Sequence, residues 1–295
     1  MKPAPLRSVL LLLLASMIWG SAFVAQSVGM DYVGPFTFLA ARSYLGWGVL
    51  VVFLALRSPA ALRPAPELCK GAVCCGGTLF AASILQQIGL QYTTVGKAGF
   101  LTALYVMIVP FLALLLLRRR LPGRIWLCAG LSLAGMYLLC LTGPVGFTRG
   151  DWLMLCSALC FGFQILTIDR FSPRTDPVAL ACGEFLVCAL LSTLPALALE
   201  HPAPRLLAGA WQSIAYAGAL SSGVAYTLQS VAQRDCDSAV SSLVMCLESV
   251  FSALFGWVLL GQALSARELA GCGLMFSAIL LSQLPLPRTR LPQQE

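Results

Sequence analysis

Charged residues are scarce in this sequence. Asp, Glu, Lys and Arg make up only 11% of its 295 residues, whereas 59% are hydrophobic and the mean hydropathy is +0.85. A water-soluble domain carries about a quarter charged residues, because its surface must interact with water. The shortage excludes a soluble globular fold and indicates that lipid covers most of the surface.

The sequence is also poor in the side chains that build catalytic and metal sites. It has one histidine, His201, beside Pro202 in a predicted loop, and no group of His, Asp or Cys at a common depth in the apolar runs. It has no Walker-type glycine loop, and the connections are too short for an ATPase domain. We therefore expect a protein that is not an enzyme, holds no metal and needs no cofactor.

Two other features of the composition have simple explanations. The net charge of +7 comes from basic residues in short loops, where they act as topology signals, so we expect no nucleic-acid partner. Most of the twelve cysteines lie inside apolar runs, where cysteine behaves as a small buried hydrophobe rather than as a metal ligand. These are Cys74, Cys75, Cys128, Cys156, Cys160, Cys246 and Cys272.

Apolar runs long enough to cross a bilayer alternate with short polar or Pro/Gly-rich stretches. Because lipid offers no hydrogen-bond partners to the backbone, each run is predicted to be a helix. The predicted helices are 8–28, 35–56, 71–90, 98–117, 125–141, 151–168, 178–199, 211–231, 239–260 and 268–284. The fold class is therefore all-α integral membrane, with about ten transmembrane helices.

The first of these runs resembles a signal peptide, since Lys2 and Arg7 precede an apolar stretch that contains Ala15. However, the stretch continues through Trp19 to Val28 and is long enough to span the membrane. We interpret it as the first helix of the mature protein.

The loop charges predict the topology. If the N-terminus is inside, 14 of the 19 Lys and Arg residues fall in inner segments and only Lys97, Arg149, Arg205 and Arg267 fall in outer loops, with Arg42 inside a span. Cytoplasmic loops carry this excess of positive charge. We expect a multi-pass protein of the plasma (inner) membrane with both termini in the cytoplasm.

The two halves of the sequence are related by an offset of about 142 residues. Rare residues coincide at that shift: Gly20 with Gly162, Pro35 with Pro177, Arg42 with Glu184, Gln87 with Gln229, and Gln91 with Gln233. Each half has five predicted helices, and an odd number inverts the second half in the membrane. The sequence predicts two inverted five-helix repeats, 8–141 and 151–284.

Several stretches match a known pattern. They are ASMIWGSAFV (15–24), QQIGLQYTTVGKAGFLTALYVMIVP (86–110), GLSLAGMYLL (130–139), SSGVAYTLQSVAQ (221–233) and LESVFSALFGWVLLGQALSARELAG (247–271). Through them nearly the whole chain resembles the EamA-type family of the drug/metabolite transporter (DMT) superfamily. The resemblance implies ten helices around a central cavity and transport of amino acids, other metabolites or drugs, often outward. Ser249 and Gln262 replace the proline and the acid that are usual in this family, so no carboxylate is available at 262.

Three ionisable side chains, Arg42, Glu184 and Glu248, lie within the predicted spans away from their ends. A charge in lipid is costly, so such residues normally face the bundle interior, pair with each other or reach the interface. Glu248 lies nearest the middle of its helix and is the best candidate for a cavity carboxylate. Either glutamate is a candidate for coupling to a proton, and helix packing is the alternative role for all three.

Amide and aromatic side chains form the second group of candidates. Glutamine offers donors and acceptors without net charge, which suits a polar or zwitterionic solute. Hydrogen bonding or packing between helices is the alternative role. The candidates for the cavity wall are Trp19, Gln87, Tyr105, Gln164, Tyr226 and Gln229, and we expect Gln87 and Gln229 to bracket the cavity as an equivalent pair.

The fifth and tenth predicted helices are rich in small residues such as Gly130, Gly135, Gly271 and Gly273, which let backbones approach closely. We interpret both as packing helices and as a candidate homodimer face. Pro110 lies inside the fourth helix and is a candidate hinge.

Secondary transport is the leading hypothesis. The expected solute is a small metabolite, such as an amino acid or a related polar or amphipathic molecule, and the expected mechanism is alternating access around a central cavity, with export as the direction. A proton is the candidate coupling ion. Multidrug efflux and a non-transporting membrane scaffold are the alternatives.

Overall fold

The computed structural model describes residues 4–93, 95–118, 121–140, 148–260 and 265–283, and these ranges contain helices and connections without a strand. The α-helices are α1 (Leu6–Gly29), α2 (Pro35–Arg57), α3 (Pro66–Gly89), α4 (Val95–Ala103), α5 (Tyr105–Leu117), α6 (Gly123–Cys140), α7 (Arg149–Phe171), α8 (Pro177–Pro195), α9 (Pro204–Gly209), α10 (Trp211–Ala215), α11 (Tyr226–Gln233), α12 (Ser238–Met245), α13 (Glu248–Leu260) and α14 (Ala266–Gln283). Two segments are π-helical: η3 (Ala196–Glu200) continues α8, and η4 (Tyr216–Ala225) joins α10 to α11. Two short 3₁₀ turns are η1 (Pro59–Leu62) and η2 (Ser172–Arg174).

All ten predicted helices are present, although the last residues of the fifth and tenth, 141 and 284, lie outside the described residues. Within the described residues, seven helical stretches are by themselves long and apolar enough to cross a membrane. Four predicted helices are less regular than the sequence indicated: the seventh ends in the π-helical η3, and the other three are the fourth, the eighth and the ninth. The fourth is divided at Leu104 into α4 and α5, the ninth is divided at 246–247 into α12 and α13, and the eighth contains the π-helical η4. The additional short helix α9 lies in the connection before α10.

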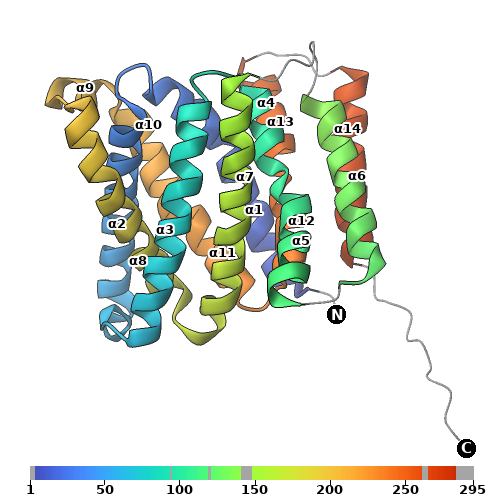
Figure 1. Ribbon diagram of the computed structural model, residues 1–295, viewed down its shortest axis with the longest axis horizontal. Helices are drawn as coiled ribbons and strands as arrows, with labels where there is room; N and C mark the ends of the chain where they lie inside the picture. The colour runs from blue at the N-terminus through green and yellow to red at the C-terminus, as the bar shows by residue number, and fades with distance from the viewer. Residues whose placement is uncertain (1–3, 94, 119–120, 141–147, 261–264, 284–295) are drawn as a thin grey trace, which may run out of the picture.

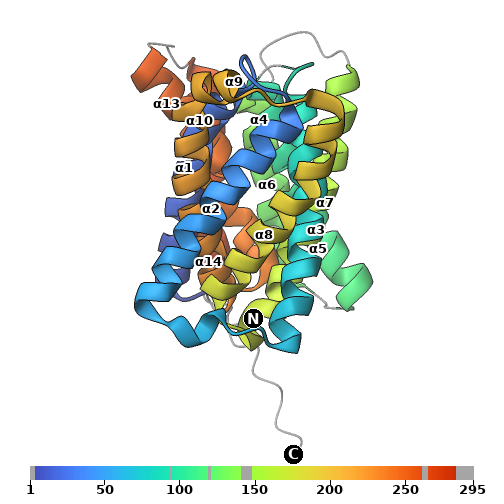
Figure 2. The same ribbon diagram turned by 90° about the vertical axis from the view of Figure 1, so that its left-hand side faces the viewer.

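The long helices stand side by side and form a bundle (Figure 1). The α1–α2 connection lies at one end of the bundle, and the α7–α8 connection lies at the other end, as expected for inverted halves. Helix α8 runs between α2 and α3 on one face (Figure 2). Helices α6 and α14 pack together at one edge, where a Cβ at Gly135 would lie only 2.7 Å from the carbonyl oxygen of Gly271.

The helix contacts repeat between the halves with the offset of 142. A Cβ at Gly76 of α3 would lie 2.7 Å from the Glu184 carbonyl oxygen and 2.6 Å from Val187 Cβ. At the equivalent position, a Cβ at Gly218 of η4 would lie 2.9 Å from the Arg42 carbonyl oxygen and 2.8 Å from Leu45 Cβ. The same residue positions therefore make the same close helix contact in both repeats.

Side-chain caps define several helix ends. Thr148 and Asp151 form a capping box at α7, and the Asp176 carboxylate accepts two backbone N–H bonds at the start of α8. Helix α2 has no cap of its own after Gly34. Instead, the carboxylate of Glu200 accepts the N–H groups of Phe36 and Thr37 at 2.9 and 2.7 Å, which ties η3 to the start of α2.

Large apolar side chains cover the outside of the bundle, including Leu56, Leu115, Leu194 and Leu280, which are at least 69% exposed. Polar side chains such as Gln164, Glu184 and Gln229 are instead buried between helices. This distribution is the reverse of that in a soluble protein and is that of a chain surrounded by lipid.

Candidate functional site

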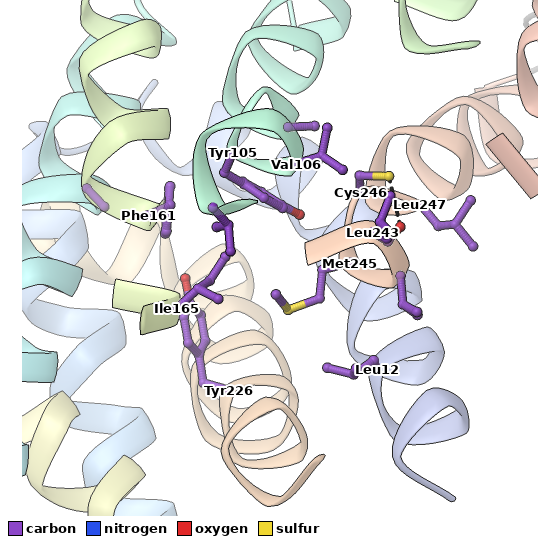
Figure 3. Packing of buried hydrophobic residues seen from close by; sticks show 14 of the residues in the cluster. Leu12, Tyr105, Val106, Phe161, Ile165, Tyr226, Leu243, Met245, Cys246 and Leu247 are labelled. Atoms are coloured by element: carbon purple, nitrogen blue, oxygen red, sulfur yellow. Dashed lines mark hydrogen bonds between the residues drawn. The ribbon is translucent and has the colours of Figure 1, made fainter. Parts of the chain in front are cut away.

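A cavity lies at the centre of the bundle, between helices of both halves. The empty space amounts to about 490 Å³, with the open space at its mouth included. The polar lining residues are Gln26, Arg42, Gln86, Thr102, Tyr105, Gln164, Ser221, Tyr226, Gln229 and Glu248, and the apolar ones are Trp19, Phe23, Phe161, Ile165 and Met245. Figure 3 shows five of these side chains, which come from four helices: Tyr105 of α5, Phe161 and Ile165 of α7, Tyr226 of α11 and Met245 of α12.

The breaks in the fourth and ninth helices lie beside this cavity. Leu104 and Cys246 are separated by 142 residues, so the two breaks are equivalent in the repeats. Tyr105 begins α5 directly after the first break, and Glu248 begins α13 directly after the second. Interrupted helices at the interface of inverted repeats commonly form the solute site of transporters.

Glu248 supplies a carboxylate to the cavity. The residue is only 6% exposed, and its Oε1 accepts a hydrogen bond from the Tyr105 hydroxyl at 3.3 Å. The bond joins the two broken helices across the repeat interface. The backbone around Glu248 packs tightly as well, because a Cβ at Gly20 of α1 would lie 2.7 Å from the Glu248 carbonyl oxygen.

Arg42 of α2 supplies the cation. It is 4% exposed, and its Nη1 donates to Oε1 of Gln26 at 3.0 Å, while its Nε has no partner among the residues that the structure describes. Within those residues, neither Arg42 nor Glu248 lies within 4.0 Å of an opposite charge. The cavity therefore holds one cation and one carboxylate that are not paired with each other. Buried charges normally have partners, and a bound solute could supply them.

Glu184 lies behind the cavity wall and is linked to the cavity by hydrogen bonds through two glutamines. Its Oε1 accepts from Nε2 of Gln164 at 2.9 Å, and Oε1 of Gln164 accepts from Nε2 of Gln229 at 3.3 Å. Glu184 is fully buried, whereas Gln164 and Gln229 line the cavity. The three residues form one hydrogen-bonded chain across α8, α7 and α11.

Aromatic rings form part of the wall. The Tyr226 ring packs edge-on against Trp19 at 4.8 Å and against Phe185 at 5.2 Å, measured between ring centroids. Edge-to-face packing is a geometry that aromatic pairs prefer, so these contacts hold the rings in fixed orientations. The indole N–H of Trp19 has no partner within the described part of the chain.

The structure brings most of the predicted site residues to this one cavity. Trp19, Arg42, Tyr105, Gln164, Tyr226, Gln229 and Glu248 all line it, and Glu184 contacts it only through Gln164. Gln87 is fully buried but is not among the lining residues, and the neighbouring Gln86 takes the place that we expected for it. Successive helix residues point about 100° apart, so the two adjacent glutamines face different directions, and here the side of α3 that carries Gln86 meets the cavity.

The sequence analysis did not select Gln26, Thr102, Ser221 or the apolar lining residues. Gln26 carried the same signal as Gln164, because it is an amide inside an apolar helix. Thr102 accepts a hydrogen bond from Gln86 Nε2 at 3.3 Å. Phe23, Phe161 and Met245 gave no signal, since nothing in the sequence separates an apolar cavity wall from an ordinary helix contact.

Comparison with known proteins gives the family. The EamA-like transporter family matches the chain twice, over residues 6–141 and 148–284, one match in each half. The chain belongs to the EamA-like transporter family. The chain is thus a transporter and not an enzyme, and it is a multi-pass membrane protein.

Relatives of this EamA-like transporter extend over nearly its full length. An uncharacterised transporter of Archaeoglobus fulgidus is 28% identical over 92% of this chain and 84% of its own. The threonine/homoserine exporter RhtA of Escherichia coli K12 is 26% identical over 96% of this chain and 92% of its own. A solved crystal structure of a 21% identical protein superposes with a TM-score of 0.80 over 93% of this chain and 96% of its own, which establishes a shared fold.

Proposed function

We propose that this EamA-like transporter exports a small metabolite that carries both an acidic and an amino group, such as an amino acid. The observation that supports this most directly is the pair of unpaired opposite charges in one cavity, Arg42 and Glu248. A zwitterion would give each charge its partner, with a carboxylate at Arg42 and an ammonium at Glu248. The relationship to a threonine/homoserine exporter agrees with that chemistry.

The transport mechanism that we propose is alternating access. The two repeats would move relative to each other around the central site, with the equivalent breaks at Leu104 and Cys246 as the points where the helices bend. A proton is the proposed coupling ion, and Glu248 is the proposed carrier, because it is a buried carboxylate in the cavity itself. We place the protein in the plasma (inner) membrane with cytoplasmic termini.

Efflux of varied amphipathic compounds is the second candidate function. The apolar part of the cavity wall favours it and consists of Trp19, Phe23, Phe161, Ile165 and Met245. The methionine side chain adapts to solutes of different shape, and the aromatic rings offer broad apolar faces. A solute with one charge would, however, leave either Arg42 or Glu248 without a partner, which favours the zwitterion.

Homodimer formation through α6 and α14 is proposed only from their small residues.

Flux through purified protein tests the proposal. Proteoliposomes would be loaded with a panel of radiolabelled amino acids, including threonine and homoserine, and efflux would be followed with and without an imposed pH gradient. We expect saturable efflux of at least one amino acid, faster when protons enter as the solute leaves. Efflux of cationic dyes without efflux of any amino acid would favour the second function, and no flux of either would contradict transport by the isolated chain.

A further inference from the structure

The two repeats place opposite charges at equivalent positions, and each charge is bonded to a glutamine of the first helix of its own repeat. Arg42 of α2 donates to Gln26 of α1, and Glu184 of α8 accepts from Gln164 of α7. Both charged side chains are buried, and both glutamines line the cavity. The repeats therefore share an architecture but differ in the sign of the charge.

The sign of each charge decides which way its glutamine must face. A guanidinium only donates, so Gln26 has to turn its carbonyl oxygen toward Arg42, at 3.0 Å. The amide NH₂ of Gln26 then remains for another partner. Together with the unpartnered Nε of Arg42, this end of the cavity offers hydrogen-bond donors.

In the second repeat the opposite holds. An ionised carboxylate only accepts, so Gln164 has to turn its NH₂ toward Glu184, at 2.9 Å. The Gln164 oxygen then accepts from the NH₂ of Gln229, at 3.3 Å. This leaves Oε1 of Gln229 as the end of the chain, and it has no partner in the residues for which coordinates are described, although Gln229 is 99% buried and lines the cavity. This end offers an acceptor.

We propose that Arg42 and Glu184 fix the amides of Gln26, Gln164 and Gln229, so that a solute binds in one orientation, with Arg42 also a direct partner of the solute and Glu184 a positioning residue. Its acidic group lies at the donor end beside Arg42 and Gln26, and its amino group, which Glu248 partners, is turned toward the acceptor end at Gln229. The inference rests on the proposed transport of a zwitterion and adds the residues that orient it. Glu184 acts on the solute without touching it.

The positions of Arg42 and Glu184 along their helices indicate how the bound solute is aligned with the bundle. Arg42 follows the start of α2 by seven residues and lies toward the end of the bundle that carries the α1–α2 connection (Figure 1). Glu184 follows the start of α8 by seven residues and lies toward the opposite end. The solute axis therefore runs along the bundle, with the amino group toward the α7–α8 connection.

Three probes separate the two ends: L-threonine, 3-hydroxybutyrate, which is threonine without its amino group, and 1-amino-2-propanol, which is threonine without its carboxylate. Threonine efflux is measured in proteoliposomes, and the two analogues are tested as inhibitors. Glu184→Gln replaces an acceptor-only group by an amide that can also donate, so the chain to Gln229 is free to reverse. We expect the threonine KM to rise about threefold to tenfold with kcat nearly unchanged, and inhibition by 3-hydroxybutyrate to stay as in the wild type.

Arg42→Gln should give the opposite pattern of inhibition by the two analogues. The threonine KM should rise, inhibition by 3-hydroxybutyrate should weaken, and inhibition by 1-amino-2-propanol should remain. A second variant separates positioning from folding: Gln164→Glu in the Glu184→Gln protein puts a carboxylate directly beside Gln229, where it again accepts from the NH₂ of Gln229. We expect this double variant to regain most of the threonine affinity.

The outcomes are distinguishable. The orientation would be overturned if the wild type transports threonine but both single variants keep the wild-type KM. It would also be overturned if each variant changes inhibition by the two analogues to the same extent. Either result would leave the proposed function intact. Failure of the double variant to regain affinity while it folds with the thermal stability of the wild type would also overturn the orientation. If wild-type protein transports no amino acid of the panel, the zwitterion function fails and the orientation fails with it.

Discussion

At the scale of single residues, Glu248 carries the most direct prediction. Glu248→Gln keeps the shape of the side chain and the contact with Tyr105 but removes the charge. A hydrogen bond to a charged group contributes about 1.5–3 kcal/mol, so we expect the KM for a transported amino acid to rise about tenfold or more. Tyr105→Phe removes only the neutral partner and should cost a few-fold. Equal KM values for Glu248→Gln and the wild type, with equal protein per vesicle, would contradict the role.

The adjacent glutamines of α3 give a matched pair. Gln86 lines the cavity and donates to Thr102, whereas both amide atoms of Gln87 are buried without a partner in the described residues. Gln86→Leu should therefore weaken apparent affinity by a few-fold. Gln87→Leu removes an unsatisfied buried amide, so it should leave affinity unchanged and the melting temperature equal or higher. Flux kinetics and thermal unfolding in detergent check both. A larger loss of affinity in Gln87→Leu than in Gln86→Leu would contradict this assignment and place Gln87 in the site.

The same pair shows what the sequence could and could not predict at this scale. Polar residues inside apolar helices are rare, so their rarity pointed to Arg42, Gln164, Gln229 and Glu248 without any coordinates. Which face of α3 meets the cavity depends on how α3 packs against α7 and α8. That packing involves residues far away in the sequence, so the pattern 86–87 alone could not separate the two side chains.

At the scale of helices, the two glycines Gly76 and Gly77 make a second matched pair. A Cβ at Gly76 would lie 2.7 Å from the Glu184 carbonyl oxygen of α8, whereas a Cβ at Gly77 would meet nothing within 4 Å. Gly76→Ala must push α3 away from α8 and should lower the melting temperature and disturb transport. Gly77→Ala should be neutral or stabilising by up to about 1 kcal/mol, because alanine favours the helix. Similar melting temperatures for the two variants would contradict the close contact.

The broken helices mark the limit of sequence reasoning at this scale. Pro110 pointed to a bend in the fourth helix, yet it lies inside α5, and the break is at Leu104. The equivalent helix of the second repeat, the ninth, breaks at 246–247. In that helix the residue equivalent to Pro110 is Ser252. A break that both repeats share cannot come from a proline that only one of them has. It reflects packing around the cavity, which local sequence does not encode.

At the scale of the whole molecule, apolar length and loop charge were sufficient to predict an all-helical membrane fold with ten spans. The offset of 142 was also visible in rare residues, and the coordinates extend it to equivalent contacts at Gly76 and Gly218. Inversion followed from an odd number of helices per repeat. The interior could not be predicted in the same way, because apolar side chains face both lipid and cavity, and composition does not separate the two.

Orientation in the membrane is the last prediction. Arg63, between α2 and α3, and Arg205, in α9, are both exposed and lie at opposite ends of the bundle (Figure 1). The excess of Lys and Arg predicts that the end with Arg63 is cytoplasmic. On a cysteine-free background that still transports, Arg205→Cys should react with an impermeant maleimide in intact cells. Arg63→Cys should react only after permeabilisation. The opposite pattern would invert the molecule and place the donor end of the cavity toward the cytoplasm, and labelling of both sites in intact cells would contradict a single orientation.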